Sequence, residues 1–388
     1  MRVLLVNDYE HKGGAEVVMH AQRAALAAVG HDVEVFAADA EGLTRSPLAY
    51  IDSHRARRLL RRRLLAFEPD VVHLHNFYHL LSPGVLGELV RWKRAGRVVA
   101  MTVHDMHIVC PNPGLLRFDG GGARLVDEGG AAGGARLFRT RWDESGWGRS
   151  LLRAGQHWWN YRVHDRRSAI DVLVAPSRWA LERVGGLGRP VRRVPNPIDL
   201  DGPALAGSDR GLNAGWTIAY AGRVEPEKGL AEFIGALEGL PVRLRVIGDG
   251  SDVARCRAEA ARAGVPAEFM GWVGQDRARR AIGDSDALVL PSRVQENAPL
   301  AVFEAIAART VPIVTGVGGL PEIVEEFGIG HVFDRGDRES VRRAIWNAQT
   351  TAPGEDAWAR AAALLAGRSS DRYARALESV YREFGCGS

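Results

Sequence analysis

Cysteine and long apolar runs are scarce in this chain of 388 residues. The three cysteines, Cys110, Cys256 and Cys386, lie far apart and form no CxxC pair, so neither a disulfide framework nor a cysteine-based zinc site is indicated. No stretch approaches the roughly 20 apolar residues that a membrane span needs. The first residues, MRVLLVN, run into a strand-like segment without a signal-type region. These absences predict a cytoplasmic protein.

Lysine is also scarce. The net charge is +4 and the isoelectric point about 9.1, yet the basic residues are nearly all arginine. We attribute this skew to GC-rich codon usage and expect no nucleic-acid partner. One basic cluster remains, HRARRLLRRRLL at residues 54–65. A solvated helix face is the simpler interpretation, and peripheral contact with the anionic inner face of a membrane is the alternative.

Short apolar runs alternate with helix-length segments throughout the chain. The runs predicted as strands are Val3–Val6, Val33–Phe36, Val71–Leu74, Val98–Val103, Val172–Ala175, Thr217–Tyr220, Leu244–Ile247, Ala287–Leu290 and Val311–Val314. Continuous apolar strands spaced by helices indicate parallel sheets covered on both faces. The fold class is therefore α/β, with two Rossmann-like doubly wound domains that face each other across a cleft.

Composition places the domain boundary near residue 200. Residues 195–215 are rich in Pro, Gly, Asp and Asn and predict a linker, so the domains are 1–200 and 201–370. A helix over 371–385 has apolar residues at helical spacing and is expected to pack back on the first domain. The Gly-rich segment 119–136 predicts a mobile surface loop, with a lid as one role. Four tryptophans nearby form either a sugar-stacking wall or core: Trp142, Trp147, Trp158 and Trp159.

In open α/β sheets, ligands bind outside the carboxyl ends of the strands, so we searched the strand ends of the second half. Arg223 and Lys228 follow the strand that ends at Tyr220. A forked guanidinium and a compact ammonium at one loop suit a diphosphate. Gly248 in VIGDG ends the next strand in a turn that permits close backbone approach.

Two carboxylates follow the third predicted strand of this half, Ala287–Leu290. Glu296 lies on the loop, and Pro299 suits the first turn of a helix that carries Glu304 about a turn and a half further on. Because helical side chains lean toward the N-terminus, both carboxylates are expected to face the same opening. The amides of 297–300 open toward it as well. Glu304 could then accept hydrogen bonds from vicinal hydroxyls such as those of a ribose.

Two further segments complete the pattern. Gly318 and Gly319, in VTGVGGLPEIV, end the next strand, and their amides could contact an anion. Asp284 and Asp286 imitate a paired-aspartate metal motif, but they precede a buried strand at the end opposite the expected ligand. We interpret them as a turn and infer no metal.

With these motifs in order, the chain resembles the family-four retaining glycosyltransferases of the GT-B fold. The resemblance rests on GRVEPEKG, VIGDG, LVLPSRVQENAPLAVFEA and GGLPEIV in the second half and on KGGAE and TVHD in the first. It spans nearly the whole chain except for roughly 115–170. Asn-Ala-Pro stands where many relatives have a glycine-containing loop.

The resemblance implies a role for each motif residue. Arg223 and Lys228 would bind the donor diphosphate, Glu296 would hold sugar hydroxyls, and Glu304 would hold the ribose. The donor would also contact Asn297, Ala298, Pro299, Leu300, Gly13, Gly14 and Gly248. His104 would lie beside the transferred sugar, and the acceptor side would include His75, Asn76 and Asp105. His73 and His75 alternate like metal ligands, but no suitably spaced partner accompanies them.

The implied reaction is transfer of a hexose-type sugar from a nucleoside-diphosphate sugar to a hydroxyl. We expect same-face substitution without metal or cofactor, a UDP-sugar rather than a GDP-sugar, and an acceptor that is a cell-envelope polysaccharide, a lipid-linked glycan or a natural-product core. Two alternatives stay open. A nucleotide-sugar 2-epimerase of the same architecture would need no acceptor, and a non-catalytic binding protein would not be expected to retain all four charged residues.

Overall fold

The computed structural model describes residues 1–93, 96–120, 122–126, 134–198 and 215–385. The chain divides into two units, unit 1 of residues 1–197 and 370–388 and unit 2 of residues 198–369. The division lies a few residues before the predicted boundary. Most of the predicted linker lies outside the described residues.

Unit 1 is built on a parallel sheet in the order β2-β1-β3-β4-β7-β8. Its strands are β1 (Arg2–Asn7), β2 (Asp32–Ala37), β3 (Val71–Leu74), β4 (Val98–Thr102), β7 (Val172–Ala175) and β8 (Val191–Arg193). A separate antiparallel hairpin consists of β5 (Leu116–Asp119) and β6 (Gly122–Leu125). The helices are α1 (Gly14–Ala28), α2 (Pro47–Ile51), α3 (His54–Phe67), η1 (Pro83–Val85), α4 (Leu86–Trp92), α5 (Ala135–Arg139), α6 (Trp147–Trp158), the π-helical turn η2 (Trp159–Val163), η3 (Arg166–Ala169), α7 (Arg178–Gly185) and α15 (Ser370–Phe384).

Both faces of this sheet are buried, as the apolar strands predict. Along β1, Val3 and Leu5 belong to a core with α1 and α15, whereas Leu4 and Val6 belong to the opposite core with α3 and α4. This two-residue alternation explains why β1 has no polar face.

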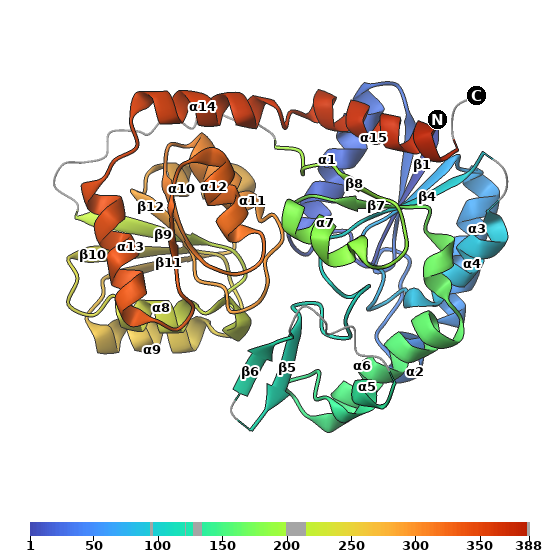
Figure 1. The fold of residues 1–388 in the computed structure, drawn as a ribbon, viewed down its shortest axis with the longest axis horizontal. Coiled ribbons are helices and arrows are strands. Elements are labelled where there is room, and N and C mark those ends of the chain that lie inside the picture. The colour runs from blue at the N-terminus through green and yellow to red at the C-terminus, as the bar shows by residue number, and fades with distance from the viewer. Residues whose placement is uncertain (94–95, 121, 127–133, 199–214, 386–388) are drawn as a thin grey trace. The chain divides into compact units, whose positions relative to one another are not determined.

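The last helix belongs to unit 1, as predicted. Figure 1 shows α15 beside α1. Tyr373 Oη donates to Gln22 Oε1 at 2.9 Å, and Gln22 Nε2 donates to Tyr381 Oη at 3.1 Å. The Tyr381 hydroxyl also lies 2.6 Å from His73 Nδ1. These buried contacts connect the end of the chain to β3.

Unit 2 repeats the plan with the parallel order β11-β10-β9-β12-β13-β14. Its strands are β9 (Trp216–Ala221), β10 (Val242–Ile247), β11 (Ala267–Gly271), β12 (Ala287–Leu290), β13 (Val311–Thr315) and β14 (His331–Phe333). Its helices are η4 (Pro226–Lys228), α8 (Leu230–Ala236), α9 (Val253–Ala263), α10 (Gln275–Gly283), α11 (Leu300–Ala307), α12 (Leu320–Phe327), α13 (Arg338–Thr350) and α14 (Glu355–Ala366). Two parallel α/β units confirm the predicted fold class.

The Gly-rich segment 119–136 is not a loop throughout, which corrects the sequence-based prediction. Its first part forms the end of β5 and the strand β6, and its last residues begin α5. Leu116 pairs with Leu125, and Phe118 pairs with Ala123. The glycine content hid a hairpin whose two strands are only four residues long. Residues 127–133 of this segment lie outside the described residues, and the role of the segment as a lid stays a prediction.

Candidate active site

The most distinctive charged pair of unit 2 joins the loops after β9 and β12. Lys228 Nζ lies 2.6 Å from Glu296 Oε1, and Ser292 Oγ donates to the same oxygen at 2.5 Å. The side chains of Lys228 and Glu296 are only 19% and 16% exposed. The structure thus brings together two residues that lie 68 positions apart in the chain, as predicted.

The carboxyl group of Glu296 is held in its charged form. Burial raises its pKa, but the charge and hydrogen bond of Lys228, the Ser292 hydroxyl and the charge of Arg223 outweigh that effect. The pKa of Glu296 therefore lies below its usual value. A charged carboxylate can accept hydrogen bonds from hydroxyl groups of a bound sugar.

Arg223 is exposed on the loop after β9. Its backbone carbonyl accepts a hydrogen bond from Tyr220 Oη at 2.5 Å. Among the described residues its guanidinium has no ion-pair partner, although its charge lowers the pKa of Glu296. The guanidinium is therefore available to an anion.

Gly248 and Gly250, after the end of β10, lie against the backbone of the loop that follows β9. A Cβ atom at Gly248 would lie 1.9 Å from Gly222 O, and one at Gly250 would lie 2.2 Å from Val224 O. The φ of Gly248 is +132°. These glycines let the end of β10 pack directly against the loop that carries Arg223, so contact of Gly248 with a ligand stays a prediction.

The glycine pair after β13 contacts the backbone of Glu296. Gly319 N donates to Glu296 O at 2.7 Å, and a Cβ atom on Gly318, whose φ is +63°, would lie 2.0 Å from that oxygen. Two loops that we predicted to lie near one ligand thus pack on each other.

Glu304 has a protein partner that we did not predict. Its Oε1 lies 3.2 Å from Nε of Arg279, a buried residue on α10, and α10 packs against α11. The isolated carboxylate of the apolar helix is therefore paired. Binding of a ribose by Glu304 stays a prediction.

The segment before α11 differs in detail from prediction. Helix α11 begins at Leu300, so Pro299 is its cap rather than its first residue. Asn297 is buried and Ala298 packs against the core. Their contacts with a donor stay predictions.

In unit 1, two predicted histidines contact each other at the ends of β3 and β4. His75 Nδ1 lies 2.7 Å from His104 Nε2, and their rings stack with centroids 5.0 Å apart. His75 is fully buried and His104 half-buried. Burial lowers the pKa of His104 to about 4 and that of His75 well below its usual value, so both imidazoles are neutral near neutral pH. His73, by contrast, bonds Thr102 and Tyr381 and belongs to the core.

Acidic and amide groups surround these strand ends. Asn7 Oδ1 accepts from Asn76 N at 2.8 Å, and the carboxylate of Asp8 accepts from the amides of residues 79–81. Burial raises the pKa of Asp8 to about 6. Burial also raises the pKa of Asp105 to about 7 despite the hydrogen bond from His107 N, and the charge of Asp8 adds to the increase.

The glycines that follow β1 lie at the start of α1. Gly13 N donates to Glu16 Oε2 at 2.8 Å, and Asn7 Nδ2 donates to Glu16 Oε1 at 2.9 Å. Gly14 is exposed, and no atom lies within 4 Å of a Cβ added there. There is thus room at Gly14 for a ligand.

The remaining charged motifs have structural roles. Within α3, Arg57 and Arg61 bind Glu88, and Arg63 binds Glu34. Asp286, from the paired aspartates, accepts from Thr217 N at 2.8 Å just before β12, which confirms the turn. Among the described residues no group of His, Cys, Asp and Glu is arranged to hold a metal ion, and no helix of those residues is long and apolar enough to cross a membrane.

Sequence reasoning missed Ser292, Arg279, Asp8 and Glu16. Asp8 carries the same signal as the predicted residues, because it directly follows a buried strand. Arg279 lies in the run DRARRAIG, and only its position on α10 distinguishes it from the other arginines of that run.

Comparison with known proteins agrees with this architecture. The family description Glycosyltransferase Family 4 matches residues 12–201, and Glycosyl transferases group 1 matches residues 212–363. The chain therefore belongs to glycosyltransferase family 4, as the sequence motifs predicted.

Two curated relatives illustrate the range of the family. Phosphatidyl-myo-inositol mannosyltransferase of Mycobacterium leprae is 26% identical over 197 residues, which are 48% of this chain and 50% of that protein. Granule-bound starch synthase 2 of Pisum sativum is 32% identical over 145 residues, 34% of this chain and 19% of that protein. The chain thus spans half the length of these relatives or less.

Solved structures match nearly the whole chain. Sucrose-phosphate synthase of Thermosynechococcus elongatus has a TM-score of 0.70 at 18% identity, with 99% of this chain and 98% of that chain covered. HepE of Anabaena, solved with UDP and glucose, has a TM-score of 0.66 at 16% identity, with 99% and 100% covered. These similarities confirm the fold.

Proposed function

We propose that this protein transfers a hexose-type sugar from a nucleoside-diphosphate sugar to an acceptor hydroxyl, with retention of anomeric configuration and without a metal ion. The observation that carries the proposal is the buried pair of Lys228 and Glu296 next to the exposed Arg223. Arg223 and Lys228 would supply the cations for a diphosphate. Glu296 would accept hydrogen bonds from a sugar at the same edge of the sheet.

The two cations would stabilise the leaving group of the reaction, the nucleoside diphosphate. Breaking the bond between the anomeric carbon and the diphosphate builds negative charge on the phosphate, which Arg223 and Lys228 would stabilise. Preorganised donors of this kind contribute roughly 3 to 4 kcal/mol each. The positive charges of Arg223 and Lys228 would take the place of a divalent cation, which supports metal independence.

The carboxylates would orient the donor. Glu296 is fixed by Lys228 and Ser292, so its second oxygen can accept from a sugar hydroxyl without reorganisation. In the proposal, Glu304 accepts hydrogen bonds from the ribose while its Oε1 stays paired with Arg279. Neither carboxylate is then required as a nucleophile, which supports same-face attack in which the leaving phosphate takes the proton of the acceptor hydroxyl.

The acceptor would use the strand ends of unit 1, where His104 offers a neutral imidazole and Gly14 open space. We propose a cell-envelope polysaccharide, a lipid-linked glycan or a natural-product core as acceptor. The names of the relatives include a mannosyltransferase for a phosphatidylinositol and synthases of starch. For the donor we propose a UDP-sugar, and the UDP complex of HepE makes UDP-glucose the first to test.

The experiment is a thermal-shift panel of UDP- and GDP-sugars in the presence of a chelator, followed by mass spectrometry of reactions with candidate acceptors. Stabilisation by one nucleotide sugar and a glycosylated product with retained configuration by NMR are expected. Conversion of the donor to an epimer without acceptor would instead identify a 2-epimerase. Failure of every nucleotide sugar to stabilise the chain would contradict the proposal.

A further inference from the structure

Six large apolar side chains are exposed within residues 138–163 of unit 1. We call them the aromatic face: Phe138, Trp147, Leu151, Trp158, Trp159 and Val163. Each is 36–52% exposed. Single exposed apolar residues are ordinary, but a gathering of them marks an interaction surface. Every exposed tryptophan and phenylalanine of the described part of unit 1 lies here.

Three residues of the aromatic face lie on α6, a helix that hydrogen bonds attach to the rest of unit 1. Trp147, Leu151 and Trp158 are four and seven residues apart, which places them on one side of α6. On the other side, the buried Gln156 donates from Nε2 to Tyr50 O and Tyr78 O, at 2.5 and 2.8 Å. The outward direction of the tryptophans is therefore fixed by inward hydrogen bonds.

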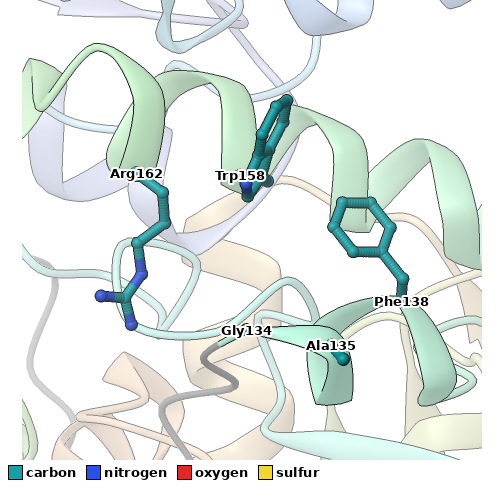
Figure 2. A pocket seen from close by; sticks show the side chains of 5 residues that line it. All are labelled: Gly134, Ala135, Phe138, Trp158 and Arg162. Carbon is teal, nitrogen blue, oxygen red and sulfur yellow. The ribbon is translucent and has the colours of Figure 1, made fainter.

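A pocket of about 510 Å³ opens in the aromatic face. It is lined by Gly134, Ala135, Phe138, Trp158 and Arg162. Figure 2 shows the rings of Phe138 and Trp158 on neighbouring helices and the guanidinium of Arg162 at one end. The two rings meet edge to face, with centroids 6.2 Å apart.

The lining favours a lipid over a sugar. Recognition of a sugar uses several convergent polar groups in addition to an aromatic platform. Among the described residues that line this pocket, the only charged side chain is the guanidinium of Arg162. Apolar walls that end in a single cation match an acyl chain below a phosphate headgroup.

The charged residues around the aromatic face also favour an anionic lipid as its partner. Between residues 134 and 165 the exposed charged residues are Arg136, Arg139, Arg149, Arg162, Glu144 and Asp165. Arginines thus outnumber carboxylates four to two. Tryptophan and arginine together are typical of surfaces that lie at the headgroup level of an anionic bilayer.

We propose that the aromatic face docks on an anionic phospholipid bilayer, with Trp158 and Phe138 at the boundary between headgroups and acyl chains and Arg162 at a lipid phosphate. This moves the expected membrane contact away from α3. There Arg57, Arg61 and Arg63 already bind carboxylates, and the exposed apolar residue is the lone Leu65. The inference is independent of the proposed sugar transfer.

The test is co-sedimentation of the full chain with vesicles of phosphatidylcholine alone or mixed with phosphatidylglycerol. We expect the wild-type chain to bind the mixed vesicles. The affinity of the double variant Phe138→Gln/Trp158→Gln should be lower by about tenfold or more, because two aromatic side chains that would be buried in the bilayer are removed. Trp346→Gln is the matched control, since Trp346 is 66% exposed on α13 of unit 2. Arg162→Gln should reduce binding to the mixed vesicles.

Circular dichroism and melting curves verify that each variant is folded. The proposal is overturned if the wild-type chain stays in the supernatant with both vesicle types, or if the double variant sediments like wild type. It is equally overturned if Arg58→Gln/Arg62→Gln abolishes binding while the double variant retains it, because α3 would then be the contact. Dimerisation through the aromatic face without vesicle binding would assign it to a second copy and also overturn the proposal.

Discussion

Arg279 Nε lies 3.2 Å from Glu304 Oε1, and the two side chains are only 6% and 16% exposed. The pair joins α10 to α11 and accounts for a carboxylate in an otherwise apolar helix. Loss of one partner of such a pair leaves a charge in a poorly solvated place, which is more costly than loss of a surface pair.

Replacement of Arg279 by Met should therefore destabilise the protein, on the order of 2 kcal/mol or more. Denaturant unfolding measures this. Glu355→Gln is the matched control, because its pair with Arg309 is exposed and worth about 0.5 kcal/mol. Addition of Glu304→Gln to the Arg279 variant should recover part of the loss. Equal effects at Arg279 and Glu355 would contradict this account.

Replacement of Lys228 by Met should reduce sugar transfer about 10²- to 10³-fold, because a cation at the leaving phosphate is lost. Initial rates with the donor found by the thermal-shift panel measure it. Lys93→Met is the matched control, since Lys93 Nζ also binds a carboxylate, that of Asp171, at 2.5 Å, and Lys93 is not among the predicted site residues. The prediction fails if both lysine variants keep wild-type rates.

Gly318→Ala and Gly328→Ala separate backbone strain from steric conflict. Both glycines have a φ of +63°. An added Cβ would lie 2.0 Å from Glu296 O at Gly318 but meet no atom within 4 Å at Gly328. Gly328→Ala should cost about 1 kcal/mol, and Gly318→Ala should cost more and also reduce transfer. Thermal unfolding and initial rates measure both effects. Similar results for the two variants would argue against contact between the loop after β12 and the loop after β13.

Asp105→Asn should change the pH dependence of stability. The pKa of Asp105 is raised to about 7 in the folded chain, so between its ordinary value and pH 7 the folded state binds more protons than the unfolded state. The wild-type chain therefore loses stability relative to Asp105→Asn as pH rises from about 4 to 7. Buried histidines with lowered pKa values oppose this trend in both proteins and cancel in the difference. A difference in unfolding free energy that is constant with pH would refute the prediction.

The central strands were predictable because they are buried on both faces and read as continuous apolar runs. Of the four strands at the edges of the two large sheets, β2 was predicted but β8, β11 and β14 were not. These three are only partly buried, and their sequences carry Arg, Glu and His. Glycine content likewise concealed the hairpin of β5 and β6. Local composition does not report which segments meet at the edge of a sheet.

In the candidate site, too, some residues could be predicted from the sequence and others could not. Lys228 and Glu296 were found because parallel strands bring their carboxyl ends to one edge, so sequence position predicts proximity. Arg279 was missed because its role depends on how α10 packs against α11. The packing role of Gly248 was missed because the sequence shows that a close approach occurs but not whether a ligand or the chain itself makes it.

The most direct test of the central claim is calorimetric titration of the nucleotide sugar selected by the panel into wild-type protein and Arg223→Met, both with a chelator present. Arg223 is exposed, so its loss should leave the fold intact while binding weakens by about tenfold or more. The account predicts tight, metal-independent binding by the wild-type chain and this loss in the variant. Equal affinity of the two proteins would contradict the claim that the loop after β9 holds the donor diphosphate.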